Sequence, residues 1–221
     1  MVNLFQGKTL MKKTLLLLIS LLALGQSAVS QSAFGLKASL NLSNHSKTVT
    51  FPQFPPPYKR ETKPMLGYQF GAFYSSPIGS KLTVVAEANF SLIGSRNQYV
   101  TEQIMLNPDG KTYYYNDRIG YLEIPLILRY NFNKFYLGLG PSVAIKLFSK
   151  ITNIENRTTK GFNYRSLDAA ANVVVGYKIS KKLEVNLRYS YGMMNILEDR
   201  FNQVTKNRFL NLSLLYLLKR K

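Results

Sequence analysis

IGYLEIPLILRYNFNKFYLGLGPSVAIKLF, residues 119–148, is the most informative segment of the sequence. Apolar side chains alternate with small or polar ones from 119 to 132 and again from 135 to 148, and Asn133-Lys134 separates the two runs. Alternation with a period of two puts successive side chains on opposite faces of a strand, and a two-residue connection between such runs is typical of a hairpin. The segment therefore predicts two antiparallel strands. Pro125 removes a backbone donor from the first, which sheets tolerate mainly at bulges.

The same alternation recurs in six further segments, at about 33–42, 65–74, 81–94, 166–179, 183–191 and 208–218. Short connections at 75–80, 133–134 and 180–182 alternate with long ones at about 43–64, 95–118, 149–165 and 192–207. An even number of strands joined alternately by short turns and long loops is typical of bacterial outer-membrane barrels. We therefore predict an all-β fold, an eight-stranded antiparallel up-and-down transmembrane β-barrel.

Residues 1–30 predict a cleaved secretory signal peptide before the barrel. Lys12 and Lys13 precede an apolar run from Leu15 to Leu24, and the small residues Ala28-Val29-Ser30 follow. This order of basic, apolar and small residues marks a signal peptide. The alternative, a membrane-spanning helix, needs about 20 apolar residues, roughly twice this run. Residues 31–221 then form the outer-membrane β-barrel domain, and Met11 is an alternative start.

Composition excludes several kinds of site. The 221 residues contain no cysteine and a single histidine, His45. Disulfide scaffolds, thiolate metal sites and cysteine nucleophiles are therefore excluded, and we expect no cofactor and no metal. Lysine and arginine outnumber aspartate and glutamate by 29 to 11, which suggests an anionic partner. An exported chain without an aromatic-basic readout motif is not expected to bind nucleic acid.

The two faces of the predicted strands differ in size and charge. The interior of an eight-stranded barrel is just wide enough for side chains to fill, so rows of Leu, Val, Phe and Tyr must face lipid and the small polar rows must face the lumen. Charges of both signs fall on the lumen row, and they are unfavourable there unless paired. These are Lys37, Glu87, Glu123, Arg129, Lys146, Asp168, Glu184 and Arg188. We predict an internal salt-bridge network that closes the lumen; the alternative is that some of these charges contact lumen water.

Aromatic and basic residues indicate the two membrane interfaces. Six aromatic residues share the lipid face next to a short turn or a chain end, namely Phe34, Tyr74, Phe132, Phe135, Tyr177 and Tyr216. They predict an interfacial girdle, although aromatics also favour strands in general. Basic residues gather at the short-turn rim and in two long loops, the latter being Lys47, Lys59, Arg60, Lys63, Lys150, Arg157, Lys160 and Arg165. We therefore expect outer-membrane lipid, including anionic headgroups, as a partner.

The first long loop carries the candidate site for a protein partner. Its prolines favour an extended shape that presents Phe51, Phe54 and Tyr58, or that simply resists proteases. A lipid-modifying enzyme is an alternative function, and its candidate residues are His45 with Ser43 or Ser46. No nucleophile-elbow motif supports such a site, so a loop histidine is the favoured interpretation. A secreted soluble ligand-binding barrel is the other alternative.

Three segments resemble PorT-family outer-membrane β-barrel proteins. They are Phe34 to Asn44, FGLKASLNLSN; Tyr121 to Tyr130, YLEIPLILRY; and Phe135 to Pro141, FYLGLGP. The resemblance implies an outer-membrane location and makes Pro125 a family trait. It also implies a link to protein secretion, with which the founding member is associated, and it supplies no catalytic residue. We therefore expect a barrel that is not an enzyme and that has a structural or interaction role.

Overall fold

The computed structural model describes residues 32–51, 54–60, 62–98, 114–152, 158–197 and 203–220. The predicted signal peptide, residues 1–30, lies outside these ranges. The strands are β1 (Ala33–Phe51), β2 (Phe54–Arg60), β3 (Thr62–Pro77), β4 (Leu82–Gln98), β5 (Tyr114–Phe132), β6 (Phe135–Thr152), β7 (Thr158–Lys160), β8 (Leu167–Lys178), β9 (Leu183–Gly192) and β10 (Gln203–Arg220). No helix in the described ranges is long and apolar enough to cross a membrane.

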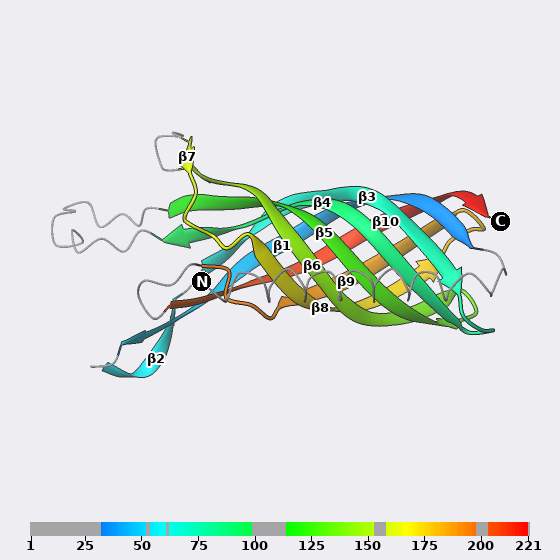
Figure 1. Ribbon diagram of the computed structural model, residues 1–221, viewed down its shortest axis with the longest axis horizontal. Coiled ribbons are helices and arrows are strands. Elements are labelled where there is room, and N and C mark those ends of the chain that lie inside the picture. The colour runs from blue at the N-terminus through cyan, green and yellow to red at the C-terminus, as the bar shows by residue number, and fades with distance from the viewer. Residues whose placement is uncertain are drawn as a thin grey trace, which may run out of the picture.

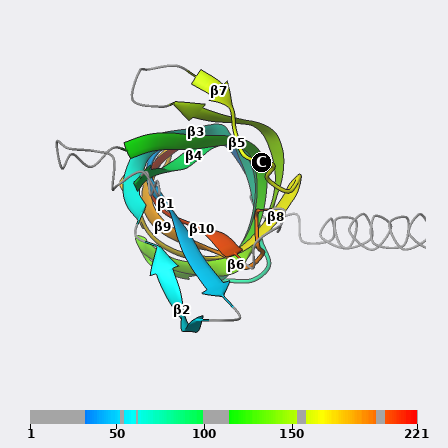
Figure 2. The same cartoon turned by 90° about the vertical axis from the view of Figure 1, so that its left-hand side faces the viewer.

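Eight long strands form a closed ring. Their order around it is β1, β3, β4, β5, β6, β8, β9 and β10, and β10 pairs with β1 to complete it (Figures 1 and 2). Every pairing is antiparallel between neighbours, so the predicted up-and-down barrel is confirmed. Closure matters because a backbone group exposed to lipid has no water to bond, and a ring leaves no open edge.

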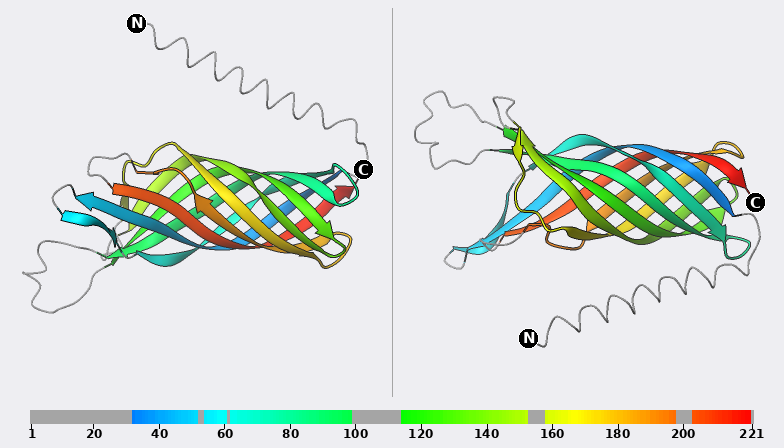
Figure 3. Two further views of the ribbon diagram at one scale, coloured as in Figure 1. Left: turned by 90° about the horizontal axis from the view of Figure 1, so that it is seen from below. Right: turned by 45° about the horizontal axis from the view of Figure 1, so that its top comes forward.

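The two ends of the barrel are different. The predicted short turns all lie at the end that also holds the C-terminus (Figure 3). In the β5–β6 turn Asn133 adopts φ 56°, a left-handed conformation that asparagine tolerates better than most residues. At the other end the strands continue beyond the predicted boundaries, and the short strands β2 and β7 extend the hairpins by pairing with β1 and β6.

The prediction of long loops is therefore wrong for part of their length. Residues 43–51, expected in a loop, continue β1, and residues 114–118 begin β5. The outward side chains of β1 change from apolar to polar after Leu42, where Asn44 and Ser46 follow. Hydrophobic alternation ends where the strand leaves the lipid layer, but backbone pairing does not depend on it and continues.

Burial is inverted relative to a soluble barrel. Large apolar side chains are exposed on the outside, as at Leu40 (58 %) and Leu139 (66 %). Polar and charged side chains fill the inside, where Asn89 and Arg188 have no exposed surface. On β5 the outward apolar row runs from Leu122 to Phe132, which matches the roughly 9–11 residues that a tilted strand needs to cross the hydrocarbon layer.

Pro125 is accommodated without a bulge, contrary to expectation. On one side it pairs with Ser142 of β6. On the other side the β4–β5 pairing passes from Ala86↔Leu126 directly to Asn89↔Glu123, with the register unchanged. The missing donor thus produces a gap in one ladder and no displacement of the strands, so every side chain keeps its face.

Aromatic rings cover two glycines on neighbouring strands. Tyr136 lies opposite Gly176 and Phe73 lies opposite Gly35, both inside the barrel. A Cβ on Gly176 would overlap the Tyr136 ring, and a Cβ on Gly35 would come within 2.5 Å of the Phe73 ring. Glycine is required at these positions because each ring lies against the facing backbone, where a Cβ would overlap it.

Candidate functional site in the barrel lumen

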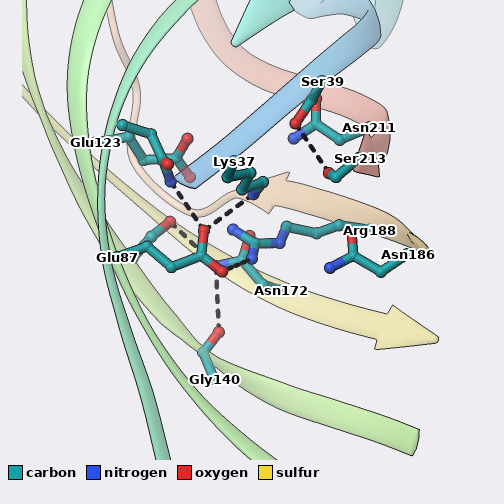
Figure 4. Close-up of polar contacts among 12 residues, drawn as sticks. Lys37, Ser39, Glu87, Glu123, Gly140, Asn172, Asn186, Arg188, Asn211 and Ser213 are labelled. Atoms are coloured by element: carbon teal, nitrogen blue, oxygen red, sulfur yellow. Dashed lines mark hydrogen bonds and ion pairs between the residues drawn. The ribbon is translucent and has the colours of Figure 1, made fainter. Parts of the chain in front are cut away.

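An ion triad crosses the middle of the lumen (Figure 4). Lys37 of β1 donates to Glu87 Oε2 at 2.9 Å, and Arg188 of β9 donates to Glu87 Oε1. Asn89 Nδ2 also donates to Oε2 at 2.9 Å. The three charged side chains have no exposed surface. Because β4 and β9 lie four strands apart in either direction around the ring, the contact between Glu87 and Arg188 spans the full width of the lumen.

A second ion pair lies nearer the short turns. Arg129 Nη1 of β5 and Glu184 Oε2 of β9 are 3.2 Å apart. The Arg129 guanidinium lies over the ring of Tyr136, with 4.4 Å to the centroid. A desolvated cation over an aromatic face is favourable, so Tyr136 supports the pair from one side while it covers Gly176 from the other.

The other three predicted lumen charges use hydrogen bonds. Glu123 Oε2 accepts from Gln69 Nε2 at 2.7 Å and from Ser91 Oγ at 3.0 Å. Asp168 Oδ2 accepts from Asn207 Nδ2 at 2.7 Å. Lys146 donates to the backbone carbonyl of Tyr164. The structure therefore brings five of the eight predicted residues into ion pairs and holds the other three in neutral contacts.

Neutral amides and hydroxyls also lie in the lumen, where the alternation predicted the small polar row, but their hydrogen-bond partners were not predicted. Ser39 donates to Ser213 at 2.9 Å across the β1–β10 seam (Figure 4). Asn172 donates to Ser142 at 3.0 Å and accepts from Ser190 at 2.6 Å. These side chains lie on the same alternating row as the charges, as the sequence predicted.

A further polar cluster lies at the long-loop end. Ser95 Oγ is 2.9 Å from His45 Nδ1, the same nitrogen is 3.8 Å from Asp117 Oδ2, and the Tyr164 hydroxyl donates to that carboxylate oxygen. His45 is buried on a strand, so its assignment to a loop is wrong. Lys47 is likewise buried inside the barrel, although the sequence placed it in a basic loop.

Burial sets the charges in this cluster, which lies beyond the outward apolar row of β1 and β5. It lowers the pKa of His45 to about 3 and raises the pKa of Asp117 to about 6. At neutral pH the imidazole is uncharged, so its contact with the Asp117 carboxylate is not an ion pair. Ser95 and Asp117 approach the same ring nitrogen, whereas a nucleophile relay needs them on opposite nitrogens. The predicted companion Ser43 instead bonds to Gly94.

Tyr164→Phe should weaken this cluster measurably. The substitution removes the hydroxyl that donates to Asp117, whose other carboxylate oxygen has no hydrogen-bond partner among the described residues. Leaving a buried acceptor without its donor costs about 1–3 kcal/mol. We expect urea to unfold the variant at a lower midpoint, measured by far-ultraviolet circular dichroism because the chain has no tryptophan. Asp117→Asn in the same background should recover part of the loss, since it removes the buried charge; no recovery would contradict this role of the Tyr164 hydroxyl.

A small cavity lies between the triad and the long-loop cluster. Its lining includes Ser91, Tyr121, Glu123, Ser142 and Asp168, and its volume is about 20 Å³, enough for about one water molecule. Glu123 Oε1 has no hydrogen-bond partner among the described residues. Within those residues no group of three or more His, Cys, Asp or Glu side chains is placed to hold a metal ion. This cavity thus has room for about one water molecule beside an unsatisfied carboxylate oxygen.

The predicted girdle and partner loop have defined positions. All six girdle residues lie on outward-facing rows close to the short-turn end, where Phe135 and Tyr177 pack with ring centroids 4.8 Å apart.

In the predicted partner loop, Phe51 ends β1, while Phe54 and Tyr58 belong to β2. The proline-rich segment is therefore the second strand of a hairpin and not the extended loop that we expected. The interfacial role of the girdle and the partner role of the hairpin remain predictions.

Comparison with family models identifies the barrel. The model described as outer membrane protein beta-barrel domain matches residues 25–198. The chain belongs to this family. Its members reside in the outer membrane, so the predicted location is confirmed for this chain, and the lumen network described above is that of an outer-membrane barrel. A search of curated proteins gives no match.

Several solved outer-membrane proteins resemble the chain. Neisserial surface protein A has 9 % identity and a TM-score of 0.49, with 85 % of this chain and 98 % of that chain covered. Ail, the attachment invasion locus protein of Yersinia pestis, crystallised with the heparin analogue sucrose octasulfate, has 13 % identity and a TM-score of 0.40, covering 83 % and 99 %. AlkL, solved in lipid bilayers, has 15 % identity and a TM-score of 0.36, covering 85 % and 91 %.

Proposed function

We propose that this outer-membrane barrel is closed and serves a structural or interaction role. The observation that carries the proposal is the Lys37–Glu87–Arg188 triad, which joins opposite walls of the lumen. Among the residues that the structure describes, lumen charges of the two signs are also equal in number: the carboxylates are Glu87, Asp117, Glu123, Asp168 and Glu184, and the cations are Lys37, Lys47, Arg129, Lys146 and Arg188. Balanced charges inside a narrow barrel, five of the residues joined in ion pairs, leave neither the width nor the net field that an ion channel needs.

Planar-bilayer recording tests the closed lumen. We expect the folded protein to give no stable conductance steps, because three levels of side chains fill the lumen: the Arg129–Glu184 pair, the triad, and the His45 cluster. Gel mobility with and without heating shows that the inserted protein is folded. A recording without conductance steps then reports on the folded barrel and not on unfolded protein. Uniform, long-lived conductance steps from folded protein would overturn the proposal.

We further propose that the long-loop end binds a protein partner and takes part in protein secretion. The resemblance to the PorT family supports the secretion role, and the β1–β2 hairpin supports the position of the contact, because it extends past the ring (Figure 1). Aromatic side chains are enriched among the residues that contribute most to binding at protein interfaces. Phe51, Phe54 and Tyr58 are the candidate anchors.

A deletion strain tests the secretion role. We expect loss of the gene to change the set of secreted and surface proteins, and the wild-type gene to restore it. Phe51→Ala/Phe54→Ala/Tyr58→Ala should leave a folded, heat-modifiable barrel that fails to restore secretion. Unchanged secretion in the deletion strain would contradict the secretion role, and full restoration by the triple variant would contradict the assigned contact.

The lipid-modifying enzyme gains no support from the site. His45 and Ser95 are both fully buried, so neither reaches the lipid surface where such a substrate would lie. Alanine at His45 with loss of a lipid-modifying activity would nonetheless restore that alternative.

A further inference from the structure

The outer surface of the barrel has a segregated charge distribution. All five carboxylates in the described part of the chain, Glu87, Asp117, Glu123, Asp168 and Glu184, are buried in the lumen. Cationic side chains, in contrast, lie both in the lumen and on the outward face, where Lys63, Arg96, Arg118 and Lys150 are exposed. No outward cation can therefore form a salt bridge with a carboxylate of the described residues, and a cation there must be satisfied by solvent, by an aromatic ring or by an external anion.

Four of these cations lie on one wall at the long-loop end. They belong to the consecutive strands β3, β4, β5 and β6, which lie side by side (Figure 1). Lys63 of β3 is directly opposite Arg96 of β4, and Arg118 of β5 is directly opposite Lys150 of β6. All four side chains are exposed. We call Lys63, Arg96, Arg118 and Lys150 the outer cation cluster.

Direct opposition of like charges is unfavourable in a sheet. No carboxylate of the described residues separates these two pairs, so each pair has an electrostatic cost that an external anion would remove. Aromatic rings offset part of it: Lys63 Nζ and the Arg96 guanidinium lie 4.6 and 5.3 Å from the ring centroid of Tyr114, and Lys150 Nζ lies 5.6 Å from that of Phe148. These contacts hold the basic groups together on the outer wall.

The position of the cluster identifies the class of anion. Three of these cations follow exposed apolar side chains on their own strands: Lys63 lies just beyond Leu66, Arg118 beyond Leu122, and Lys150 beyond Phe148. The cluster therefore lies at the depth where the hydrocarbon layer gives way to headgroups, at the end with the longer connections. Arginine forks bind phosphate through two parallel hydrogen bonds, and lysine binds it as a point charge.

We propose that the outer cation cluster binds the phosphate groups of lipid headgroups, with one phosphate between Lys63 and Arg96 and another between Arg118 and Lys150. The inference narrows the expected attraction of anionic headgroups from whole rims to one wall of the barrel. It requires only the outer-membrane location, so it is independent of whether the lumen is closed and of any role in secretion.

The test compares the thermal unfolding midpoint of the protein in two kinds of vesicle. Gel mobility measures the fraction of protein that stays folded at each temperature. One kind is pure phosphatidylcholine, and the other contains phosphatidylglycerol in addition. Arg118→Gln/Lys150→Gln should raise the unfolding midpoint in phosphatidylcholine by about 2–4 °C, because repulsion is relieved, and lower it by a similar amount with phosphatidylglycerol, because the bridging phosphate is lost. Lys63→Gln/Arg96→Gln should behave in the same way.

Two controls distinguish a built phosphate site from general charge attraction and from binding of free anions. Lys81→Gln/Lys181→Gln removes the same charge from two short turns that do not face each other, and it should show no reversal of sign between the vesicles. An equal effect of this control would mean general attraction by net charge and would overturn the proposal. Inorganic phosphate added to phosphatidylcholine vesicles should not reproduce the stabilisation by phosphatidylglycerol; full reproduction would indicate a site for free anions and overturn the assignment to lipid.

Discussion

Glu87→Gln is expected to lower the free energy of unfolding by about 3–5 kcal/mol. Glutamine keeps the shape of the side chain but removes the charge that both Lys37 and Arg188 contact, and it leaves two buried cations without a counter-charge. Breaking a buried ion pair costs this much because the remaining charge stays desolvated. Urea unfolding of the folded barrel, followed by circular dichroism and by gel mobility, measures the change.

The triple variant Lys37→Met/Glu87→Leu/Arg188→Met is the matched control. It removes all three charges together, so no uncompensated ion remains, and replacement of a buried ion cluster by apolar side chains is often neutral or stabilising. We expect its stability to lie close to that of the wild type despite three substitutions at the same place. A Glu87→Gln variant within about 1 kcal/mol of the wild type would mean that lumen water solvates these charges, which was the alternative to an internal network.

Ser39→Cys/Ser213→Cys should produce a barrel locked by a disulfide between its first and last strands. The two residues are direct cross-strand partners whose hydroxyls are 2.9 Å apart, and they are 174 positions apart in the chain. Closing so long a loop in the unfolded state stabilises the folded state by about 5 kcal/mol in the chain-entropy model. The chain has no other cysteine, so the cross-link cannot be mistaken for another pairing.

The measurement is the unfolding midpoint of oxidised against reduced protein. Ser39→Cys/Asn211→Cys serves as the control: Asn211 faces the same lumen but pairs with Asn41, two positions out of register. We expect the first variant to cross-link under mild oxidation and the control to remain reduced. Efficient cross-linking of the control instead would contradict the register of the β1–β10 seam and with it the closure of the ring.

The sequence predicted the ring because lipid imposes a strict alternation on it. Within the hydrocarbon layer each outward side chain must be apolar. The eight strands and the three short turns were therefore predictable from the alternation of apolar and polar residues. Outside the layer both faces are polar, and Asn44, Ser46 and Thr48 carry no signal that separates strand from loop. This explains why the ends of β1 and β5 were missed, and with them the lumen positions of His45, Lys47 and Asp117.

The same alternation predicted which charged side chains face the lumen, but it did not predict which of them pair with one another. Lys37 and Arg188 share Glu87, while Glu123 takes two neutral donors and Lys146 takes a carbonyl. These choices depend on which strands meet across the lumen and on how far each is staggered along the axis, and both are properties of the closed ring. A single strand holds no information about its opposite wall.

The span of the triad has a consequence for the order of folding events. Arg188 reaches a carboxylate 101 positions earlier in the chain, and β10 completes a ring that β1 begins. A partly inserted set of hairpins holding Glu87 would carry a desolvated charge whose partner had not yet arrived, so partial insertion is penalised until the last strands enter. Contacts so distant in sequence also make assembly slow. We therefore expect the ion contacts of the lumen to make insertion a concerted late step that is completed when β10 meets β1.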